Sequence, residues 1–269
     1  MKSKIMSVIR FILIIIILAC LAILGKRLLD YRTNLQNNKA IEDVVKEVEN
    51  DDANNNQNES EDKKPETKPL SPEEEFQKKK EHYQKIISVL KEKYNNDDIV
   101  AFIDIPDVGV SYPIVQGIDN DYYLNRGLNG EYDIAGSIFI DMNNKPDFND
   151  DNTVIYGHHL EIKSMFTPLD QYRKQEFAEK HQTIYLATLT ELREYKIFSA
   201  YGIPADYQYR TLYFTDRDDV VPFFNKLRSN SEVLLDSPTF KADDKIITLS
   251  TCQYDYKDQR LAIHAVRVK

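Results

Sequence analysis

The feature that most constrains this chain is residues 11–25, a run of fifteen residues without a single charge. A helix that crosses a lipid bilayer needs about 20 predominantly apolar residues. Extending the run back to Ile5 reaches that length if Arg10 directs its charged end to the lipid headgroups. We therefore expect a short N-terminal tip and a membrane anchor within residues 1–36, which leaves only the later residues for a soluble domain.

Two other interpretations of this run compete with an anchor. The apolar region of a cleaved signal peptide spans about 7–15 residues, but no small-residue cleavage site precedes Lys26. The triplet Leu18-Ala19-Cys20 loosely resembles a bacterial lipid-attachment site, but mostly apolar residues follow Cys20 where such proteins usually become polar. The sequence favours an uncleaved anchor.

Charge divides the chain into three parts. Residues 1–40 carry a net charge of +6, residues 41–75 carry −9, and residues 76–269 carry −6. Residues 37–70 are rich in Asn, Asp, Glu and Lys and nearly free of aromatic residues, which predicts a disordered acidic linker. Residues 71–269 then form the functional domain. Its acidic balance argues against a nucleic-acid partner.

A helix is predicted at the start of this domain. Ser71 can cap the helix, Pro72 suits its first turn, and Glu74 completes a capping box. Apolar residues follow at helical spacing from Phe76 to Tyr94. One face of this helix is expected to pack on the rest of the domain.

Short β-rich runs separated by turn residues follow this helix. The eight runs are 99–105, 110–115, 136–141, 153–156, 183–189, 194–201, 245–251 and 261–268. Helical patches interrupt them near 120–126, 169–180 and 216–229. The strands do not alternate regularly with helices, which argues against a doubly wound α/β fold. We predict a mainly β fold: a closed, largely antiparallel barrel with an N-terminal helix and a helical insert between late strands.

Candidate catalytic residues lie at the ends of these strands. Cys252, the one cysteine of the domain, ends the run Thr248-Leu249-Ser250-Thr251-Cys252. A cysteine nucleophile needs a nearby base or cation. His158 and His159 end the strand at 153–156 and alternate in direction, so at most one of them faces Cys252. Arg260, eight residues after Cys252, would lie beside it across an antiparallel turn. Taken singly, these residues are more often a buried thiol, a structural histidine and a surface arginine.

Together these residues resemble those of the sortases, the membrane-anchored cysteine transpeptidases of Gram-positive bacteria. The resemblance rests on Thr-Leu-Ser-Thr-Cys at 248–252, Tyr-Gly-His at 156–158 and Arg260, and it extends over residues 72–269. The N-terminal helix, the insert at 216–229 and Ser164-Met165-Phe166 resemble class B. The resemblance implies an eight-stranded sortase barrel, with Cys252 as nucleophile, His158 as general acid/base and Arg260 as stabiliser of the oxyanion or substrate. Thr251 is a candidate substrate contact.

The resemblance also implies a reaction and a location. A sorting motif on a surface protein would be cleaved through a thioacyl enzyme and joined to an amine of a peptidoglycan stem peptide or a pilin lysine. The N-terminus would be cytoplasmic and the catalytic domain extracellular. Residues 206–214 and 216–229 are expected to set specificity, and His264 is interpreted as structural. No cofactor is expected.

Three alternatives remain open. A cysteine peptidase using the same Cys–His pair would release its product to water. A membrane-tethered binding module would keep Cys252 buried and inert. A zinc site from His158, His159 and Cys252 is disfavoured, because ligands on one helical face need i, i+4 spacing. We expect no metal, and the acidic run at 147–151 is interpreted as a solvated turn.

Overall fold

The computed structural model describes residues 2–58, 70–160, 164–204, 206–253 and 259–269. The chain divides into two compact units, Met1–Ala40 and Ile41–Lys269. The first unit is helical and belongs to α1 (Lys2–Asn58). The apolar side chains of residues 11–18 are about half exposed or more, and this helix is long and apolar enough to cross a membrane. Both observations are consistent with the predicted anchor.

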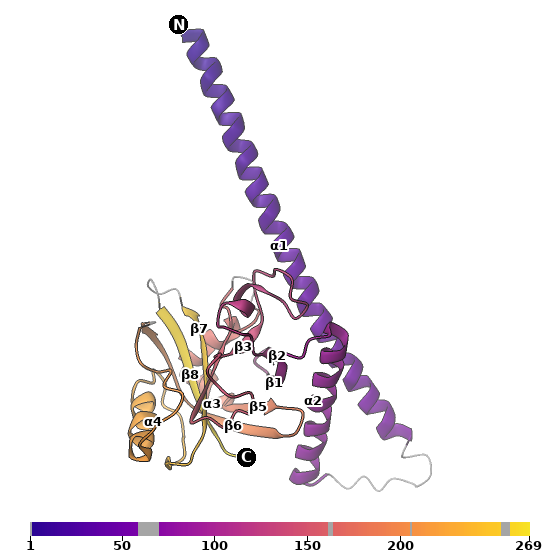
Figure 1. Ribbon diagram of the computed structural model, residues 1–269, viewed down its shortest axis with the longest axis vertical. Coiled ribbons are helices and arrows are strands. Elements are labelled where there is room, and N and C mark those ends of the chain that lie inside the picture. Colours follow the sequence, from indigo (N-terminus) through magenta and orange to yellow (C-terminus); the bar gives the residue numbers. More distant parts are fainter. Residues whose placement is uncertain (1, 59–69, 161–163, 205, 254–258) are drawn as a thin grey trace. The chain divides into compact units, whose positions relative to one another are not determined.

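The second unit is a closed barrel of eight strands (Figure 1). The strands are β1 (Ile99–Ile105), β2 (Val110–Val115), β3 (Ile138–Ile140), β4 (Asn152–Tyr156), β5 (Thr183–Ala187), β6 (Leu192–Pro204), β7 (Ile246–Gln253) and β8 (Gln259–Arg267). Around the barrel their order is β1-β2-β3-β4-β7-β8-β6-β5. The pairs β2–β3 and β4–β7 are parallel, and the other pairs are antiparallel. The predicted closed barrel is confirmed.

Helices lie outside the barrel and in its connections. They are α2 (Pro72–Tyr94), η1 (Tyr122–Asn125), η2 (Thr167–Arg173), α3 (Gln175–Lys180), η3 (Arg217–Asp219) and α4 (Val220–Ser229). In Figure 1, α2 and α4 lie on opposite sides of the barrel. The Ser71 hydroxyl accepts from the Glu74 N–H and the Glu74 carboxylate accepts from the Ser71 N–H, so the capping box is confirmed. The insert predicted between late strands is η3 and α4, between β6 and β7.

Apolar side chains fill three regions of the second unit. The barrel interior holds a cluster that includes Ile103, Ile155 and Leu249, all at most 1% exposed. A second cluster lies between α2 and the outer faces of the strands. A third packs α4 against β6 and β8 through aromatic rings such as Phe198 and Phe224. Large apolar side chains buried on both faces of the barrel wall make it a rigid support for residues at the strand ends.

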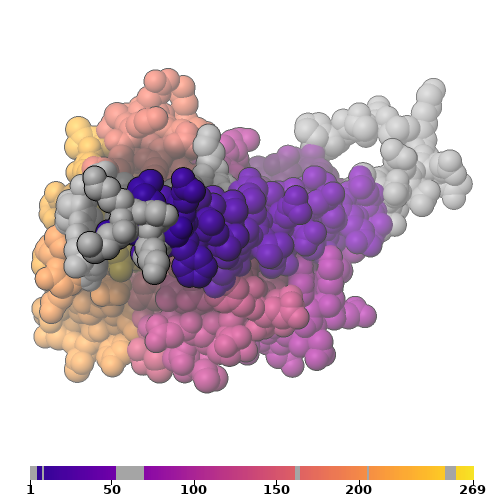
Figure 2. Space-filling view, turned by 90° about the horizontal axis from the view of Figure 1, so that it is seen from above, coloured from indigo at the N-terminus to yellow at the C-terminus, as the bar shows by residue number. Residues whose placement is uncertain are grey.

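The structure differs from the sequence expectation over residues 37–58, which were expected to be disordered. They are helical, and Ile41, Val44 and Val48 are at most 7% exposed, packed with α2 in the second cluster. Figure 2 shows the violet end of α1 against the magenta α2. Asp52 also accepts from the Nδ1–H of His82 at 2.8 Å. Although this segment is acidic overall, Ile41, Val44 and Val48 are spaced i, i+3, i+7 and form an apolar stripe on one helix face. Such a stripe is stable in water only when it packs on another element, here α2. The remaining linker residues, 59–69, lie outside the described residues.

Replacing Val48 by Asp tests whether this stripe belongs to the folded domain. Val48 is 1% exposed, so a carboxylate there is either buried without a partner or forces the segment off α2. We expect the free energy of unfolding to fall by about 2–4 kcal/mol in urea denaturation. Glu47→Ala, at an exposed neighbouring position, is the matched control. Equal midpoints for the two variants would show that residues 41–52 contribute nothing to domain stability.

Candidate active site

The parallel β4–β7 pair sets the position of His158. Tyr156 is opposite Ser250 in this pair, and the N–H of Gly157 donates to the Ser250 carbonyl at 3.2 Å. The backbone hydrogen bonds between β4 and β7 thus continue one residue past the end of β4. His158 comes next in the chain, at the level where β7 reaches Cys252. The two residues that the sequence assigns to one chemical step therefore stand at the same end of neighbouring strands.

The antiparallel β7–β8 pair adds the arginine. Cys252 is directly opposite Arg260 in its register, as the short connection between the two strands predicts. The side chain of Cys252 lies outside the described residues, so the structure gives only its backbone position. His158, Cys252 and Arg260 thus occupy one end of three adjacent strands, β4, β7 and β8.

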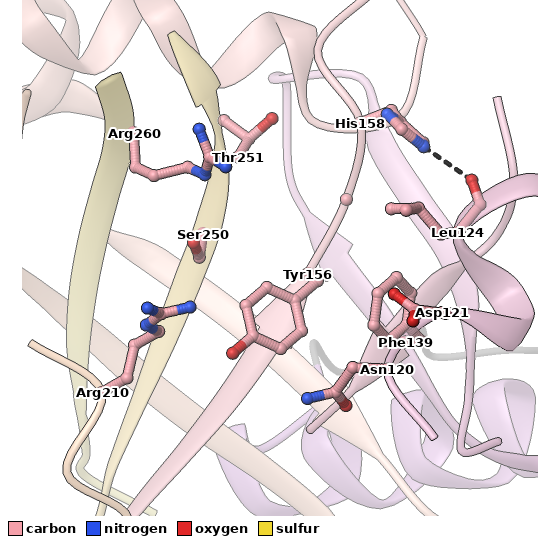
Figure 3. A pocket seen from close by; sticks show the side chains of 11 residues that line it. Asn120, Asp121, Leu124, Phe139, Tyr156, His158, Arg210, Ser250, Thr251 and Arg260 are labelled. Atoms are coloured by element: carbon pink, nitrogen blue, oxygen red, sulfur yellow. Dashed lines mark hydrogen bonds between the residues drawn. The ribbon is translucent and has the colours of Figure 1, made fainter. Parts of the chain in front are cut away.

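A pocket of about 270 Å³ opens at this end of the barrel. Figure 3 shows Arg210, Ser250, Thr251 and Arg260 on one side, with His158 and the η1 segment on the other and Tyr156 between them. The lining residues are Asn120, Asp121, Leu124, Phe139, Tyr156, Gly157, His158, Arg210, Ser250, Thr251 and Arg260. Polar groups from distant parts of the chain converge on a concave, partly apolar space, which is typical of a ligand site.

The ring of His158 is oriented by a backbone carbonyl. Its Nε2–H donates to the carbonyl of Leu124 in η1 at 2.6 Å (Figure 3). Gly136 leaves room for that carbonyl, because its φ is +57° and a Cβ there would lie 2.4 Å from the Leu124 oxygen. Because Nε2 carries the donated hydrogen, Nδ1 is the ring nitrogen that can exchange a proton with a reacting group.

Gly157 between the tyrosine and the histidine is required by packing. A Cβ at this position would lie 2.6 Å from Ile138 and 2.6 Å from Phe166, closer than carbon atoms approach. The Phe166 N–H in turn donates to the His158 carbonyl at 3.1 Å. The Tyr-Gly-His motif is therefore a close-packed unit in which the glycine lets β3 and the Phe166 segment approach His158.

Arg260 and Thr251 both reach the pocket. The guanidinium of Arg260 donates to the Gln259 carbonyl at 3.0 Å, and the rest of its fork lies along the pocket wall in Figure 3. Thr251 is 3% exposed, and its Oγ1 has no hydrogen-bond partner among the residues that the structure describes. A buried hydroxyl without a partner at a pocket wall is costly unless something that binds there satisfies it.

The sequence model of the Sortase domain family matches residues 103–268. The chain belongs to the sortase family. Sortase B of Listeria monocytogenes is 38% identical to it over 171 residues, which are 62% of this chain and 69% of that protein. These matches confirm the class B resemblance, and with it a cysteine transpeptidase.

Solved sortase structures have the same fold. The X-ray structure of Clostridium perfringens sortase B is similar with a TM-score of 0.64 and 28% identity, over 68% of this chain and 99% of that chain. A Staphylococcus aureus sortase B–substrate complex is similar with a TM-score of 0.62 and 29% identity, over 73% of this chain and 98% of that one. The roles of individual residues in this sortase remain predictions.

His264 belongs to a buried polar chain behind the sortase pocket. The Asn152 amide N–H₂ donates to the Thr211 carbonyl at 3.1 Å, so its Oδ1 accepts from the Thr248 hydroxyl at 2.7 Å. Having donated its one hydrogen, Thr248 accepts from the Nδ1–H of His264 at 2.9 Å, and Nε2 accepts from the Tyr201 hydroxyl at 2.9 Å. His264 is thus neutral and ties β8 to β7 and β6, as its structural interpretation implies.

Asp151 corrects the interpretation of residues 147–151 as a solvated turn. Its side chain is 5% exposed and pairs with Arg217 at 2.7 Å and Lys245 at 2.8 Å, and it accepts from the Phe214 N–H at 3.0 Å. Burial alone would raise the pKa of Asp151, but the hydrogen bonds from Lys245 and Arg217 hold that pKa below its ordinary value. The carboxylate fastens the insert to the start of β7.

Among the described residues, no group of His, Cys, Asp and Glu is arranged to hold a metal.

Sequence reasoning missed part of the pocket of this sortase. Arg210, within the range expected to affect specificity, lies in the pocket and hydrogen-bonds Tyr156. The Tyr156 hydroxyl donates to Asp141 at 3.0 Å, and Asn120 donates to the same carboxylate oxygen at 3.0 Å. Burial, with the negative charge of Asp141, raises the pKa of Tyr156, which stays a neutral donor. These contacts join residues up to 90 positions apart, and no local motif marks them.

The buried His264 predicts a specific pH dependence of stability. Burial lowers its pKa from 6.5 to about 3 in the folded state. The unfolded chain therefore binds this proton first, and the contribution of neutral His264 is complete above about pH 6.5 and lost as the pH falls toward 3. We expect wild-type unfolding free energy to drop in this window with a slope of up to about 1.4 kcal/mol per pH unit from this residue.

His264→Gln isolates that contribution, because glutamine has no proton to gain. Urea denaturation of both proteins between pH 7.5 and 4 should give curves that converge as the pH falls. Parallel curves over this range would show that His264 does not titrate differently in the folded and unfolded chains.

Proposed function

We propose that this sortase is a membrane-anchored transpeptidase that cleaves a sorting signal and joins the amino-side (acyl) fragment, which holds the donor protein, to an amine. The observation that carries the proposal is the register of β4, β7 and β8, which brings the backbone positions of His158, Cys252 and Arg260 to one end of the barrel, where His158 and Arg260 line the pocket. The three come from a 103-residue span of sequence, and the β4–β7 and β7–β8 pairings bring them together. A nucleophile, a proton-transfer group and a fixed cation are the groups that acyl transfer requires.

In the first half-reaction, the Cys252 sulfur bonds to the carbonyl carbon of the scissile peptide, a threonine carbonyl in the family pattern. Arg260 stabilises the negative charge that develops on the carbonyl oxygen. The carbon–nitrogen bond then breaks, and His158 donates to the leaving amine, through Nδ1, the proton that it took from the Cys252 thiol. The product is a thioester on Cys252. The Nε2 contact with Leu124 keeps the ring in the orientation that this transfer needs.

In the second half-reaction, an acceptor amine attacks the thioester carbonyl. His158 removes a proton from the attacking nitrogen, and the Cys252 sulfur leaves. The acceptor is an amine of a peptidoglycan stem peptide or a pilin lysine, and the donor is a surface protein with a sorting signal. The substrate complex of the S. aureus sortase B supports a sorting-signal substrate for this pocket. An amine acceptor, rather than water, makes the enzyme a transpeptidase.

The walls of the pocket support a role in holding the donor peptide. The Thr251 hydroxyl is buried without a partner among the described residues, so a peptide N–H or carbonyl would satisfy it. Arg210 lies beside Ser250, on the same wall as Thr251, away from His158 (Figure 3). Because the leaving amine must lie next to His158, the acyl side of the donor would extend along this wall.

The proposed location is the cell membrane, with the catalytic domain outside the cell. The long apolar helix at the N-terminus supports a single membrane span. Similar numbers of basic residues flank the span on its two sides, so their distribution does not indicate which end faces the cytoplasm. Peptidoglycan acceptors and surface-protein donors require the domain to face outward, which leaves the short N-terminal tip in the cytoplasm.

Peptide cleavage with and without an amine tests the proposed function. The protein is incubated with a library of pentapeptides that have Thr in the fourth position and a fluorophore–quencher pair, and its mass is then measured. We expect a thioacyl adduct on Cys252 and an amine-dependent product. Cys252→Ala should abolish both and remain folded, and His158→Ala should lose nearly all activity. Release of acid alone, at every amine concentration, would favour a peptidase. An inert, unalkylated Cys252 would favour a binding module.

Arg260→Lys tests whether the planar fork of the guanidinium is needed. Lysine keeps the positive charge but cannot offer two parallel donors to substrate and oxyanion. We expect kcat/KM for peptide cleavage to fall roughly 10²-fold. Arg267→Lys, at the opposite end of β8 from Arg260, is the matched control and should retain full activity. Full activity in Arg260→Lys would reduce the role of Arg260 to charge alone.

A further inference from the structure

The side chain of His159, the residue after His158, contacts the carboxylate of Asp170 and does not line the pocket. Its Nε2 lies 2.5 Å from Oδ2 of Asp170, and its side chain is 15% exposed. His159 does not line the pocket, whereas the preceding residue His158 does. Adjacent residues of an extended segment point to opposite sides. The backbone that presents the catalytic ring on one side is therefore held on the other side by His159.

Asp170 is mounted on a rigid element. It lies in η2, between Leu169 and Tyr172, which are both fully buried, and the Tyr172 hydroxyl donates to the His181 carbonyl at 2.6 Å. The Asp170 side chain is 38% exposed, but its backbone is held in place by these buried neighbours. A hydrogen bond from His159 to Asp170 thus connects the segment after β4 to the packed interior of the barrel.

The segment from His158 to Thr167 makes other contacts besides this pair, because the Phe166 N–H donates to the His158 carbonyl at 3.1 Å and both Met165 and Phe166 are buried in the barrel core. Within its described residues, His159 pairs with Met165 as an isolated bridge, and the Thr167 hydroxyl bonds both the N–H and the carbonyl of Leu160. Met165 has φ of +53°, an unfavourable backbone conformation for a residue with a side chain. An anchor from His159 to η2 opposes relaxation of this loop.

We propose that the His159–Asp170 pair is a positioning device for His158, which fixes the backbone at the point where the catalytic imidazole begins. This inference rests on the proposed function, since it assigns a role in the transfer of the proton by His158. It predicts that losing the pair slows the chemical step and leaves peptide binding nearly unchanged. An error of about 1 Å in the placement of a reacting group costs up to about 10²-fold in rate.

Four variants test the pair. His159→Leu and Asp170→Ala remove the hydrogen bond. His159→Gln keeps an N–H donor at nearly the reach of Nε2, and the fourth variant combines His159→Leu with Asp170→Ala. His82→Leu is the matched control, because His82 also contacts a carboxylate, Asp52, at 2.8 Å but lies on α2 away from the pocket. Thermal unfolding of each protein shows whether it is folded at the assay temperature.

The rate of thioacyl formation is measured in single turnovers over a range of peptide concentrations. We expect the maximal rate to fall about 10- to 100-fold in His159→Leu and in Asp170→Ala, with half-saturation within about twofold of wild type. The double variant should be no slower than either single one, because the pair acts as a unit. His159→Gln should recover most of the rate. His82→Leu should match wild type.

Three results would each overturn the inference. The first is additive losses of rate in the double variant, the second is a change confined to the half-saturation concentration, and the third is a rate in His159→Gln as low as that in His159→Leu. If the wild type forms no thioacyl adduct, the proposed function fails, and alkylation of Cys252 still tests the pair. A correctly placed imidazole supports the thiolate. Alkylation in His159→Leu should then fall from the wild-type rate toward that of His158→Ala, and an unchanged rate would refute positioning.

Discussion

The parallel pairing of β4 with β7 is the constraint on which the rest of the site depends. A parallel pair cannot be closed by a tight turn, so the chain travels through η2, α3, β5, β6 and α4 between the two strands. That long path builds most of the barrel. It also brings the carboxyl ends of both strands to the same edge, where the motif at 156–158 and the motif at 248–252 meet. Pairing in the opposite direction would separate the two motifs by the length of the strands.

Buried polar contacts keep this edge in register. Thr248 is held between Asn152 on β4 and His264 on β8, and so links the three strands whose ends bring His158, Cys252 and Arg260 together. Asp151, immediately before Asn152, pairs with Lys245 at the opposite end of β7. A slip of β7 by one residue would reverse its side chains and break both contacts. The polar groups thus specify one alignment where apolar packing alone would accept several.

Much of this fold could be predicted from the sequence because its signals are local. Turn residues bound each strand, the capping box marks Ser71, and the short β7–β8 connection places Cys252 beside Arg260. What sequence reasoning missed is non-local. The partner of Asp151 lies 94 residues away, and the carbonyl that orients His158 lies 34 residues before it and has no side-chain signature. The helix at 41–48 had a visible apolar spacing, but the acidic composition around Val44 outweighed it.

The glycine of the Tyr-Gly-His motif also bears on how such an enzyme can diverge. Any side chain at Gly157 would clash with both Ile138 and Phe166. A substitution of Gly157 is therefore tolerated only after both neighbours have been replaced by smaller residues. The Phe166 segment also holds the His158 carbonyl, and its change would disturb the catalytic ring. By contrast, Asn120 and Arg210 reach the pocket from connecting segments that tolerate replacement. Descendants of this chain can therefore change the part of the pocket that Asn120 and Arg210 line by single substitutions, whereas the part around Gly157 and His158 can change only when several residues change together.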